Sequence, residues 1–298
     1  MEVEIKVEEF SKVFTSIVLE ALPFIIIGVF LSSFIQMYIS EEHIRRILPK
    51  NKLAGGILAS MVGLVFPTCE CTSVTITKGL MKKGVPVNMA ITYMLAAPIV
   101  NPLVILSTYY AFNNNVKIVA LRVAIGMIAA IVIGYLILIL SPSDVSNIMK
   151  DDKYVINPCT CGCCTGNHKG LKPFLYHASA EFNNVAVYFI VGAFLAAASN
   201  LIISKQSLIS VRSPVVVSTI IMLAFAYFVS LCSEADAFVA STFMAHFPLC
   251  SVMSFLVLGP MIDIKNTLML MSYFKKSFVL KLTFLIFAVD FILCSLII

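Results

Sequence analysis

The sequence predicts an all-α protein that crosses a membrane several times. Hydrophobic residues make up 60% of its 298 residues, charged residues only 12%, and the mean hydropathy is +0.98. A soluble domain carries about 25% charged residues. Apolar stretches of about 20 residues are typical of spanning helices, and here they are 13–39, 87–112, 117–141, 174–203, 213–232, 249–273 and 277–298. We therefore expect a multi-pass protein of the cell (inner) membrane, with the lipid bilayer as its first partner.

The charge balance favours a membrane protein without nucleic-acid binding. The net charge of +5 is modest and comes mostly from short basic loops. Basic loops of this kind set the orientation of a chain in the bilayer. The chain also contains no nucleotide-binding loop. We expect no nucleic-acid partner, no enzyme activity and, for any transport, energy from an ion gradient or a separate subunit.

The first motif whose residues could form a functional site covers residues 64–71, Leu-Val-Phe-Pro-Thr-Cys-Glu-Cys. A charge at the bilayer centre costs about 2.5–3.5 kcal/mol on insertion scales, so an intramembrane Glu70 indicates a functional site. Cys69 and Cys71 would point apart on a helix but to one side of an extended segment, which a break at Pro67 permits. Thiolates bind soft species such as Cu(I), Zn(II) or trivalent arsenic. The alternative is that both cysteines pack as small apolar residues.

A second motif lies at the end of the apolar run 213–232, where a cysteine is closely followed by acidic residues. It is extended by polar residues of the broken segment after residue 259. Intramembrane charges usually pair, so the lysine there can neutralise one of the three acids. The other acids could bind a cation or carry a proton, because an apolar site favours the protonated carboxyl. A purely structural ion network is the alternative. The candidate substrate-binding residues outside the first motif are Asn101, Cys232, Glu234, Asp236, Asp263, Lys265 and Asn266.

The chain reads as a duplicated unit. Moving the second half back by 162–164 residues aligns Gly28 with Gly192, Cys69 with Cys232, Pro86 with Pro248, Pro98 with Pro260 and Asn101 with Asp263. We predict a first membrane repeat at 10–141 and a second at 174–298, joined by a loop at 142–173. Prolines inside apolar segments break helices, and paired interruptions in two halves indicate the substrate site of a transporter.

The distribution of basic residues favours inverted repeats. If residues 53–83, and the matching part of the second half, double back at the Cys/acid motif, most Lys and Arg residues fall on one side. The positive-inside bias of cytoplasmic loops supports this arrangement. Each repeat then has an odd number of full spans. The prediction is about eight membrane segments, with broken or re-entrant helices at the two Cys/acid motifs.

The loop 142–173 is the only long polar stretch, and the charge bias places it in the cytoplasm. Its thiol density indicates a soft metal ion, the only cofactor we expect here. The spacing is tighter than the usual Cys-x2–4-Cys pairs of a structural zinc site. A flexible linker with incidental thiols is the alternative. The candidate metal ligands are Cys159, Cys161, Cys163, Cys164 and His168.

The order of motifs resembles that of the predicted permease family that includes the ArsP-type organoarsenical efflux permeases. The motifs are Pro-x-Cys-x-Cys at 67–71, Gly-Val-Pro at 84–86, Ala-Pro-Ile-Val-Asn-Pro at 97–102, Leu-Cys-Ser-Glu-Ala-Asp at 231–236 and Gly-Pro-Met-Ile-Asp-Ile-Lys-Asn at 259–266. The resemblance covers about residues 10–112 and 175–298 and is closest to an uncharacterised bacterial branch.

This resemblance implies a multi-spanning inner-membrane permease in which vicinal thiols bind a trivalent arsenical. By motif, Cys69 and Cys71 would be those thiols. Characterised members tend to read Cys-Ser-Cys-Gly, whereas this chain has Glu70 and Thr72. The departure bears on the specificity for arsenicals and leaves the permease assignment intact.

Three functions follow from these features. The first is a permease that exports a thiophilic metal or metalloid, a small inorganic or organometalloid substrate, through a site between the repeats. The second is a membrane thiol–disulfide oxidoreductase that uses Cys69 and Cys232, which would leave the neighbouring acids unexplained. The third is a membrane metal sensor, which predicts no cavity between the repeats. Asp290, inside the last apolar run, receives no role, and a homo-oligomer is left open.

Overall fold

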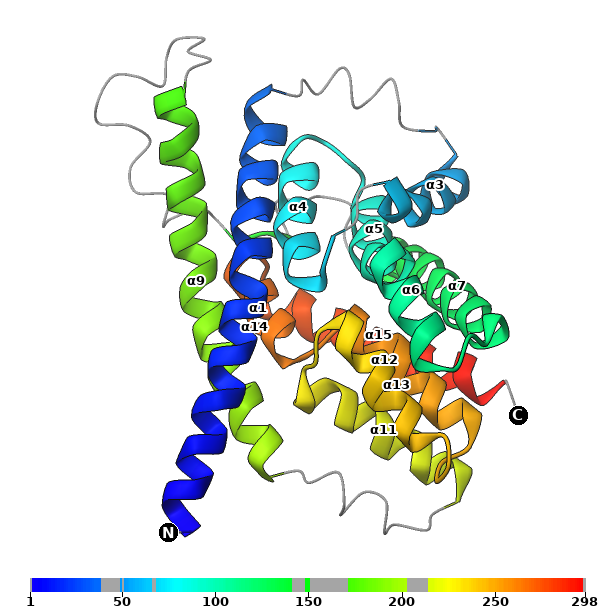
Figure 1. Ribbon diagram of the computed structural model, residues 1–298. Helices are drawn as coiled ribbons and strands as arrows, with labels where there is room; N and C mark the ends of the chain where they lie inside the picture. Colours follow the sequence, from blue (N-terminus) through cyan, green and yellow to red (C-terminus); the bar gives the residue numbers. More distant parts are fainter. Residues whose placement is uncertain are drawn as a thin grey trace.

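The computed structural model describes residues 2–38, 49, 51–65, 68–140, 148–150, 171–202 and 214–296. In these ranges the chain is helical apart from short connections and one isolated β-bridge between Met149 and Phe274. The helices of the first half are α1 (Glu2–Tyr38), α3 (Lys52–Val65), α4 (Glu70–Lys82), α5 (Val87–Val100), α6 (Pro102–Ala111) and α7 (Val116–Leu140). Those of the second half are α9 (Leu171–Ile202), α11 (Val215–Val229), α12 (Ser233–Phe243), α13 (Leu249–Met261), α14 (Ile264–Tyr273) and α15 (Lys276–Ser295). Figure 1 shows this arrangement.

The described residues contain five segments long and apolar enough to cross a membrane, or six if α5 and α6 count as one span. The five are Glu8–Phe34, Val116–Leu140, Phe174–Asn200, Leu249–Tyr273 and Lys276–Ser295. The axes of α5 and α6 meet at an angle of 41°. The all-helical, multi-pass architecture is therefore confirmed. A total of about eight segments requires that the shorter apolar helices α3 and α11 also enter the bilayer, and it stays a prediction.

Polar residues cap the helices at the breaks inside the long apolar segments. Between α5 and α6, the side chain of Asn101 accepts a hydrogen bond from the backbone N–H of Leu103 at 3.0 Å. Pro102 follows at the first helical position, where its missing N–H costs nothing. Between α13 and α14, the carboxylate of Asp263 accepts from the backbone N–H of Asn266 at 2.6 Å. These caps satisfy backbone groups that lipid could not.

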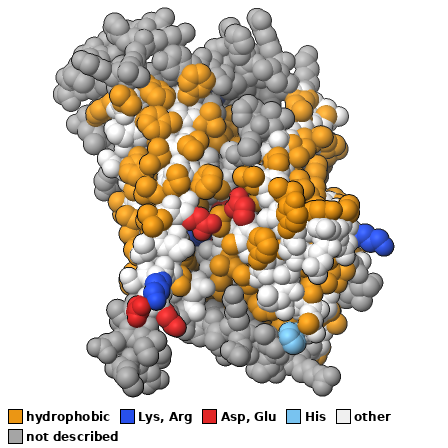
Figure 2. Space-filling model, in the orientation of Figure 1, with side chains coloured by type: hydrophobic (Ala, Val, Ile, Leu, Met, Phe, Trp, Pro, Cys, Tyr) orange, Lys and Arg blue, Asp and Glu red, His pale blue; other side chains and the backbone are white. Residues whose placement is uncertain are grey.

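The core of the molecule surrounds α5 and α13. Every residue of α5 is buried, and α5 and α13 contact each other as well as neighbours on both sides. By contrast, α1, α7, α9 and α15 expose rows of large apolar side chains. An exposed apolar surface of this extent is what a lipid-facing helix requires. Figure 2 shows one such face, which is predominantly hydrophobic.

Two glycines allow the long helices α1 and α9 to approach the helices that carry the polar residues. A Cβ atom added to Gly28 of α1 would lie 2.6 Å from Thr72 Cγ2 in α4. A Cβ atom added to Gly192 of α9 would lie 2.9 Å from the Cα of Lys265 in α14. The helices α1 and α9 also contact each other and lie side by side at one edge of the bundle (Figure 1). Together they close one wall of the site described next.

Candidate functional site

A cavity of about 400 Å³ lies between α1 and the starts of three helices, α4, α12 and α14. Its chemically distinctive lining residues are Cys69, Glu70, Cys71, Cys232 and Lys265. Helix α1 contributes Lys12, Ser16, Glu20 and Phe24, and α9 contributes Asn200. Figure 2 shows acidic side chains midway along the otherwise mostly hydrophobic face. Helix N-termini carry partial positive charge, so three of them at one cavity favour an anionic or thiolate species there.

The two thiols of the first motif lie on either side of the start of α4. Cys69 occupies the N-cap position with extended backbone, and its Sγ lies 3.1 Å from the hydroxyl oxygen of Thr72. Cys71 is already in the first turn, and both cysteines are buried. Of the two geometries that the sequence permits, the backbone is extended at Cys69 alone, because the helix resumes at Glu70 directly after the cap. Both residues nevertheless line the same cavity.

Glu70 connects the two halves of the chain at the centre of the site. Only 3% of its surface is exposed, and its carboxylate accepts a hydrogen bond from the hydroxyl of Ser233 at 2.6 Å. Glu70 lies in the first turn of α4 and Ser233 in the first turn of α12. A carboxylate is stabilised by the partial positive charge of a helix N-terminus. The Cys-Glu-Cys motif and the Cys-Ser-Glu motif thus meet through one direct bond.

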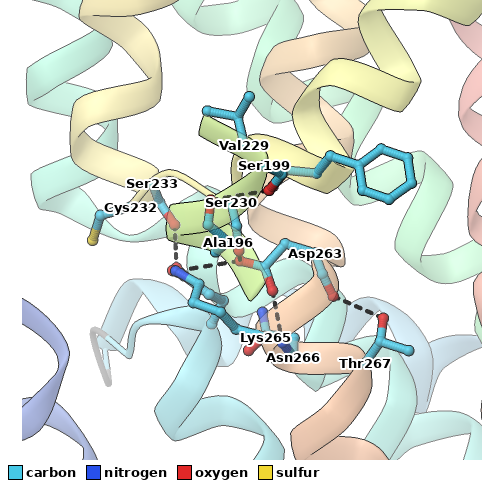
Figure 3. Close-up of polar contacts among 12 residues, drawn as sticks. Ala196, Ser199, Val229, Ser230, Cys232, Ser233, Asp263, Lys265, Asn266 and Thr267 are labelled. Carbon is cyan, nitrogen blue, oxygen red and sulfur yellow. Dashed lines mark hydrogen bonds and ion pairs between the residues drawn. The ribbon is translucent and has the colours of Figure 1, made fainter. Parts of the chain in front are cut away.

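Lys265 brings a positive charge to the cavity and pairs with Asp263. The Lys265 Nζ and Asp263 Oδ2 atoms are 3.4 Å apart, and both residues are buried. The same carboxylate accepts hydrogen bonds from the hydroxyl of Ser230 and the backbone of Asn266 (Figure 3). Lys265 lines the cavity, whereas Asp263 does not. Two hydrogen bonds therefore fix the carboxylate that pairs with the Lys265 ammonium group, and Lys265 lines the same cavity as the thiols.

The second motif supplies one half-buried thiol to the cavity. Cys232 occupies the N-cap position of α12, and its thiol donates a hydrogen bond to Glu234 Oε2 at 3.0 Å. Cys232 lines the cavity and Glu234 lies beside it without lining it. Cys69, Cys71 and Cys232 are therefore three thiols on one cavity. All three are free cysteines in the structure.

Asp236 binds Arg122, a partner that the sequence analysis missed. The Arg122 Nη2 atom lies 2.9 Å and 2.8 Å from the two carboxylate oxygens of Asp236, and Nη1 donates to Thr108 at 2.6 Å. The Nη2 atom also donates to the Ser233 carbonyl at 3.5 Å. Arg122 is 1% exposed. The signal that could have identified it is an arginine inside the apolar run 117–141, because such a charge needs a buried partner.

The remaining predicted residues lie near the site or outside the described structure. Asn101 caps α6, and Asn266 lies in the first turn of α14 with its side-chain oxygen buried and without a partner in the described structure. Neither lines the cavity. The predicted metal ligands lie outside the described residues: Cys159, Cys161, Cys163, Cys164 and His168. Within the described ranges, no three His, Cys, Asp or Glu side chains are placed to hold one metal ion.

Comparison with known proteins identifies the family of the chain. The model of the predicted permease family ArsP_1 matches residues 6–298. UPF0718 protein YcgR of Bacillus subtilis (strain 168) is 42% identical over 275 residues, which cover 92% of each chain. A Streptococcus mutans protein described as a two-component membrane permease complex subunit is 35% identical over 90% of this chain and 88% of its own. No solved structure matches the chain. The chain therefore belongs to the predicted permease family ArsP_1.

Proposed function

We propose that this permease exports a thiophilic metalloid of the trivalent arsenical class through the cavity beside α4, α12 and α14. The observation that carries the proposal is the convergence of three thiols, Cys69, Cys71 and Cys232, on one cavity inside an apolar bundle. Glu70 and Lys265 supply charges of both signs to the same space. Permease family membership supports transport, and the thiols support a soft substrate.

The donor set favours a metalloid over a bare metal ion. A soft metal ion such as Zn(II) usually needs four ligands, of which at least three come from the protein. Three thiols line the cavity, but no three His, Cys, Asp or Glu side chains of the described residues are placed to hold one metal ion. A trivalent arsenical R–As(OH)2 needs only two thiols: two As–O bonds break, two As–S bonds form, and the two thiol protons leave with the hydroxide groups as two water molecules. The reaction needs no oxidant or reductant and reverses when water enters.

We also propose that the two halves have inverted topology. The order of helices from α3 to α7 recurs from α11 to α15, with Cys69 and Cys232 at equivalent caps. Contacts between the halves recur as well, because α6 packs on α12 and α14 packs on α4. These reciprocal contacts are expected of two related units joined by a pseudo-two-fold axis, and the positive-inside bias favours the inverted arrangement.

Labelling with a membrane-impermeant thiol reagent tests the inversion. The reagent is applied to single-cysteine variants of a chain whose native cysteines have been replaced. The variants Lys83→Cys and Lys276→Cys should be labelled from one side of the membrane. The variants Asn114→Cys and His246→Cys should be labelled from the other side. Asn114, His246 and Lys276 are exposed, and Lys83 is half-buried. Each side receives one site from each half, and inversion places the repeat counterparts, Lys83 with His246 and Asn114 with Lys276, on opposite sides. Labelling of Lys83→Cys and Asn114→Cys from the same side would contradict the proposal.

The oxidoreductase alternative stays in view because Cys69 and Cys232 line the same cavity. It predicts a reversible disulfide between these two cysteines, which mild oxidation followed by alkylation of the remaining free thiols would detect. The sensor alternative predicts a sealed interface between the halves, and the cavity argues against it. The carboxylates and Lys265 around the thiols favour transport, since thiol exchange between two cysteines does not need them.

The test of the proposed function is accumulation of arsenite, methylarsonous acid, zinc and copper in a deletion strain of the native host. The native host is used because the Streptococcus mutans relative is described as one subunit of a complex, and a second subunit would then be present. Cells with wild-type protein should accumulate less methylarsonous acid than cells without it. Cys69→Ser and Glu70→Gln should lose this difference, since one removes a ligand and the other removes the charge beside it.

The matched control is Cys250→Ser, which changes a buried cysteine of α13 that does not line the cavity. It should export like the wild type, with equal protein in the membrane. Equal accumulation of all four species with and without the wild-type protein would refute the efflux proposal and favour the redox alternative. Lower accumulation of zinc or copper alone would refute the metalloid substrate.

A further inference from the structure

A further buried acid, Asp290 in α15, takes no part in the cavity. No surface of Asp290 is exposed, and neither carboxylate oxygen has a hydrogen-bond partner in the described structure. No residue of α15 lines the cavity. Asp290 thus differs from Glu70, Asp236 and Asp263, each of which has named partners.

Among the described residues, no positive charge neutralises Asp290. Helix α15 packs against α7, α11, α13 and α14. The described helices α11 and α13 carry no charged residue. On α7 and α14, Arg122 pairs with Asp236 and Lys265 pairs with Asp263, while Lys117 is exposed. On α15 itself, Lys281 lies nine residues earlier, about 13 Å along the helix axis.

The titratable groups near Asp290 are thiols. Cys294 follows one turn later on α15 and interacts electrostatically with both Asp290 and Cys250 of α13. Cys250 and Cys294 are free and buried. Two hydroxyl groups lie next to these thiols in sequence or space: the Thr219 hydroxyl of α11 is 3.0 Å from the Ser251 hydroxyl of α13. The described residues here form no group that could hold a metal ion. The chemistry therefore suits a proton better than a metal ion.

An ionised carboxylate without a counter-charge is not stable in such a place, because the interior cannot replace its hydration. The group must keep its proton, and a proton on an unpartnered carboxyl can leave whenever water reaches it. A purely structural role gives no reason for an acid here, since an unsatisfied polar group weakens packing. An intramembrane ionisable residue with these properties is expected to be functional.

We propose that Asp290 is a proton-binding site, distinct from the substrate cavity, that couples transport to a proton gradient. The evidence for proton binding is that the carboxyl group is buried and has no hydrogen-bond partner in the described structure. The coupling rests on the proposed export function. Proton uptake leaves Asp290 neutral inside the bundle of α7, α13 and α15, and release requires a conformation in which this interface admits water. Substrate and proton would then occupy separate sites in one transport cycle.

Infrared spectroscopy tests the proton site without any transport. At neutral pH, purified wild-type protein should show a carbonyl stretching band of a protonated carboxyl that Asp290→Asn and Asp290→Leu lack. Both variants should fold, since the substitution breaks no hydrogen bond. Cys294→Ala, which leaves the acid in place, should keep the band. A band that is the same in wild type and both variants would overturn the site.

Inverted membrane vesicles from the deletion strain of the native host test the coupling. They carry wild-type or variant protein and an imposed proton gradient, with methylarsonous acid as the probe. Wild-type protein should accumulate the probe against its gradient, whereas Asp290→Asn should only equilibrate it. Accumulation by Asp290→Asn that equals the wild type would overturn the coupling. If wild-type protein moves no probe at all, the export proposal fails, and the infrared result still decides whether Asp290 binds a proton.

Discussion

Replacement of Arg122 by methionine should destabilise the protein by about 3–5 kcal/mol, because it leaves Asp236 as a buried charge without a partner. Asp236 is 2% exposed, and two hydrogen bonds of 2.9 Å and 2.8 Å join its carboxylate to one nitrogen of Arg122. The substitution also removes the bond to Thr108 and the contact with the Ser233 carbonyl. Denaturant titration of the purified protein in detergent gives the free energy of unfolding and measures this loss.

The double variant Arg122→Met/Asp236→Leu separates the cost of an unpaired charge from the value of the pair. Replacement of a buried ion pair by apolar residues is often neutral or stabilising, so the double variant should recover most of the lost stability. Arg122→Lys keeps the charge but cannot repeat the planar geometry of the guanidinium group, and should fall between the two. A double variant no more stable than Arg122→Met would show that the unpaired acid is not the cause.

This ion pair joins the halves of the chain on one side of the site only. Arg122 lies in α7 of the first half and Asp236 in α12 of the second. The position in α15 that corresponds to Arg122 by the repeat offset falls at 284–286, and the described residues there include no cation. The duplicated order of helices therefore encloses an asymmetric polar centre, with a tight connection at α6, α7 and α12.

The cavity thiols were predictable from sequence because their pattern is local. A cysteine or an acid in an apolar run stands out, and the spacing of Cys69, Glu70 and Cys71 needs no knowledge of the fold. Their convergence with Cys232 and Lys265 followed from the repeat, which indicated that equivalent breaks meet. The choice between a helical and an extended arrangement of Cys69 and Cys71 was left open, because the sequence does not reveal that α4 begins at Glu70.

The partners of the buried acids were not predictable in the same way. Arg122 and Asp236 are 114 residues apart in sequence, and the choice among several acids depends on which faces of α7 and α12 meet. The three acids and one lysine of the second half suggested that two acids were free. Arg122 corrects this count, because it neutralises Asp236. Glu70 binds a hydroxyl group and Glu234 a thiol, so these two acids carry no ion pair in the described structure.

Replacement of Lys265 by methionine should abolish export. Lys265 lines the cavity, within electrostatic range of Glu70, Cys71 and Cys232. An ammonium group there offsets the negative charge of a thiolate during exchange with the substrate. The cost in stability should be smaller than for Arg122→Met, because Asp263 keeps its hydrogen bonds from Ser230 and from the backbone of Asn266. Efflux of methylarsonous acid from cells and unfolding in detergent measure the two effects separately.

The double variant Lys265→Met/Asp263→Asn decides whether the pair is a structural network or part of the transport site. The asparagine can still accept the backbone hydrogen bond that caps α14, and no charge remains without a partner, so stability should return toward the wild-type value. Export should stay abolished, because the cavity still lacks its ammonium group. If export returned together with stability, Lys265 would serve only to neutralise Asp263, and the thiols with Glu70 would remain as the transport site.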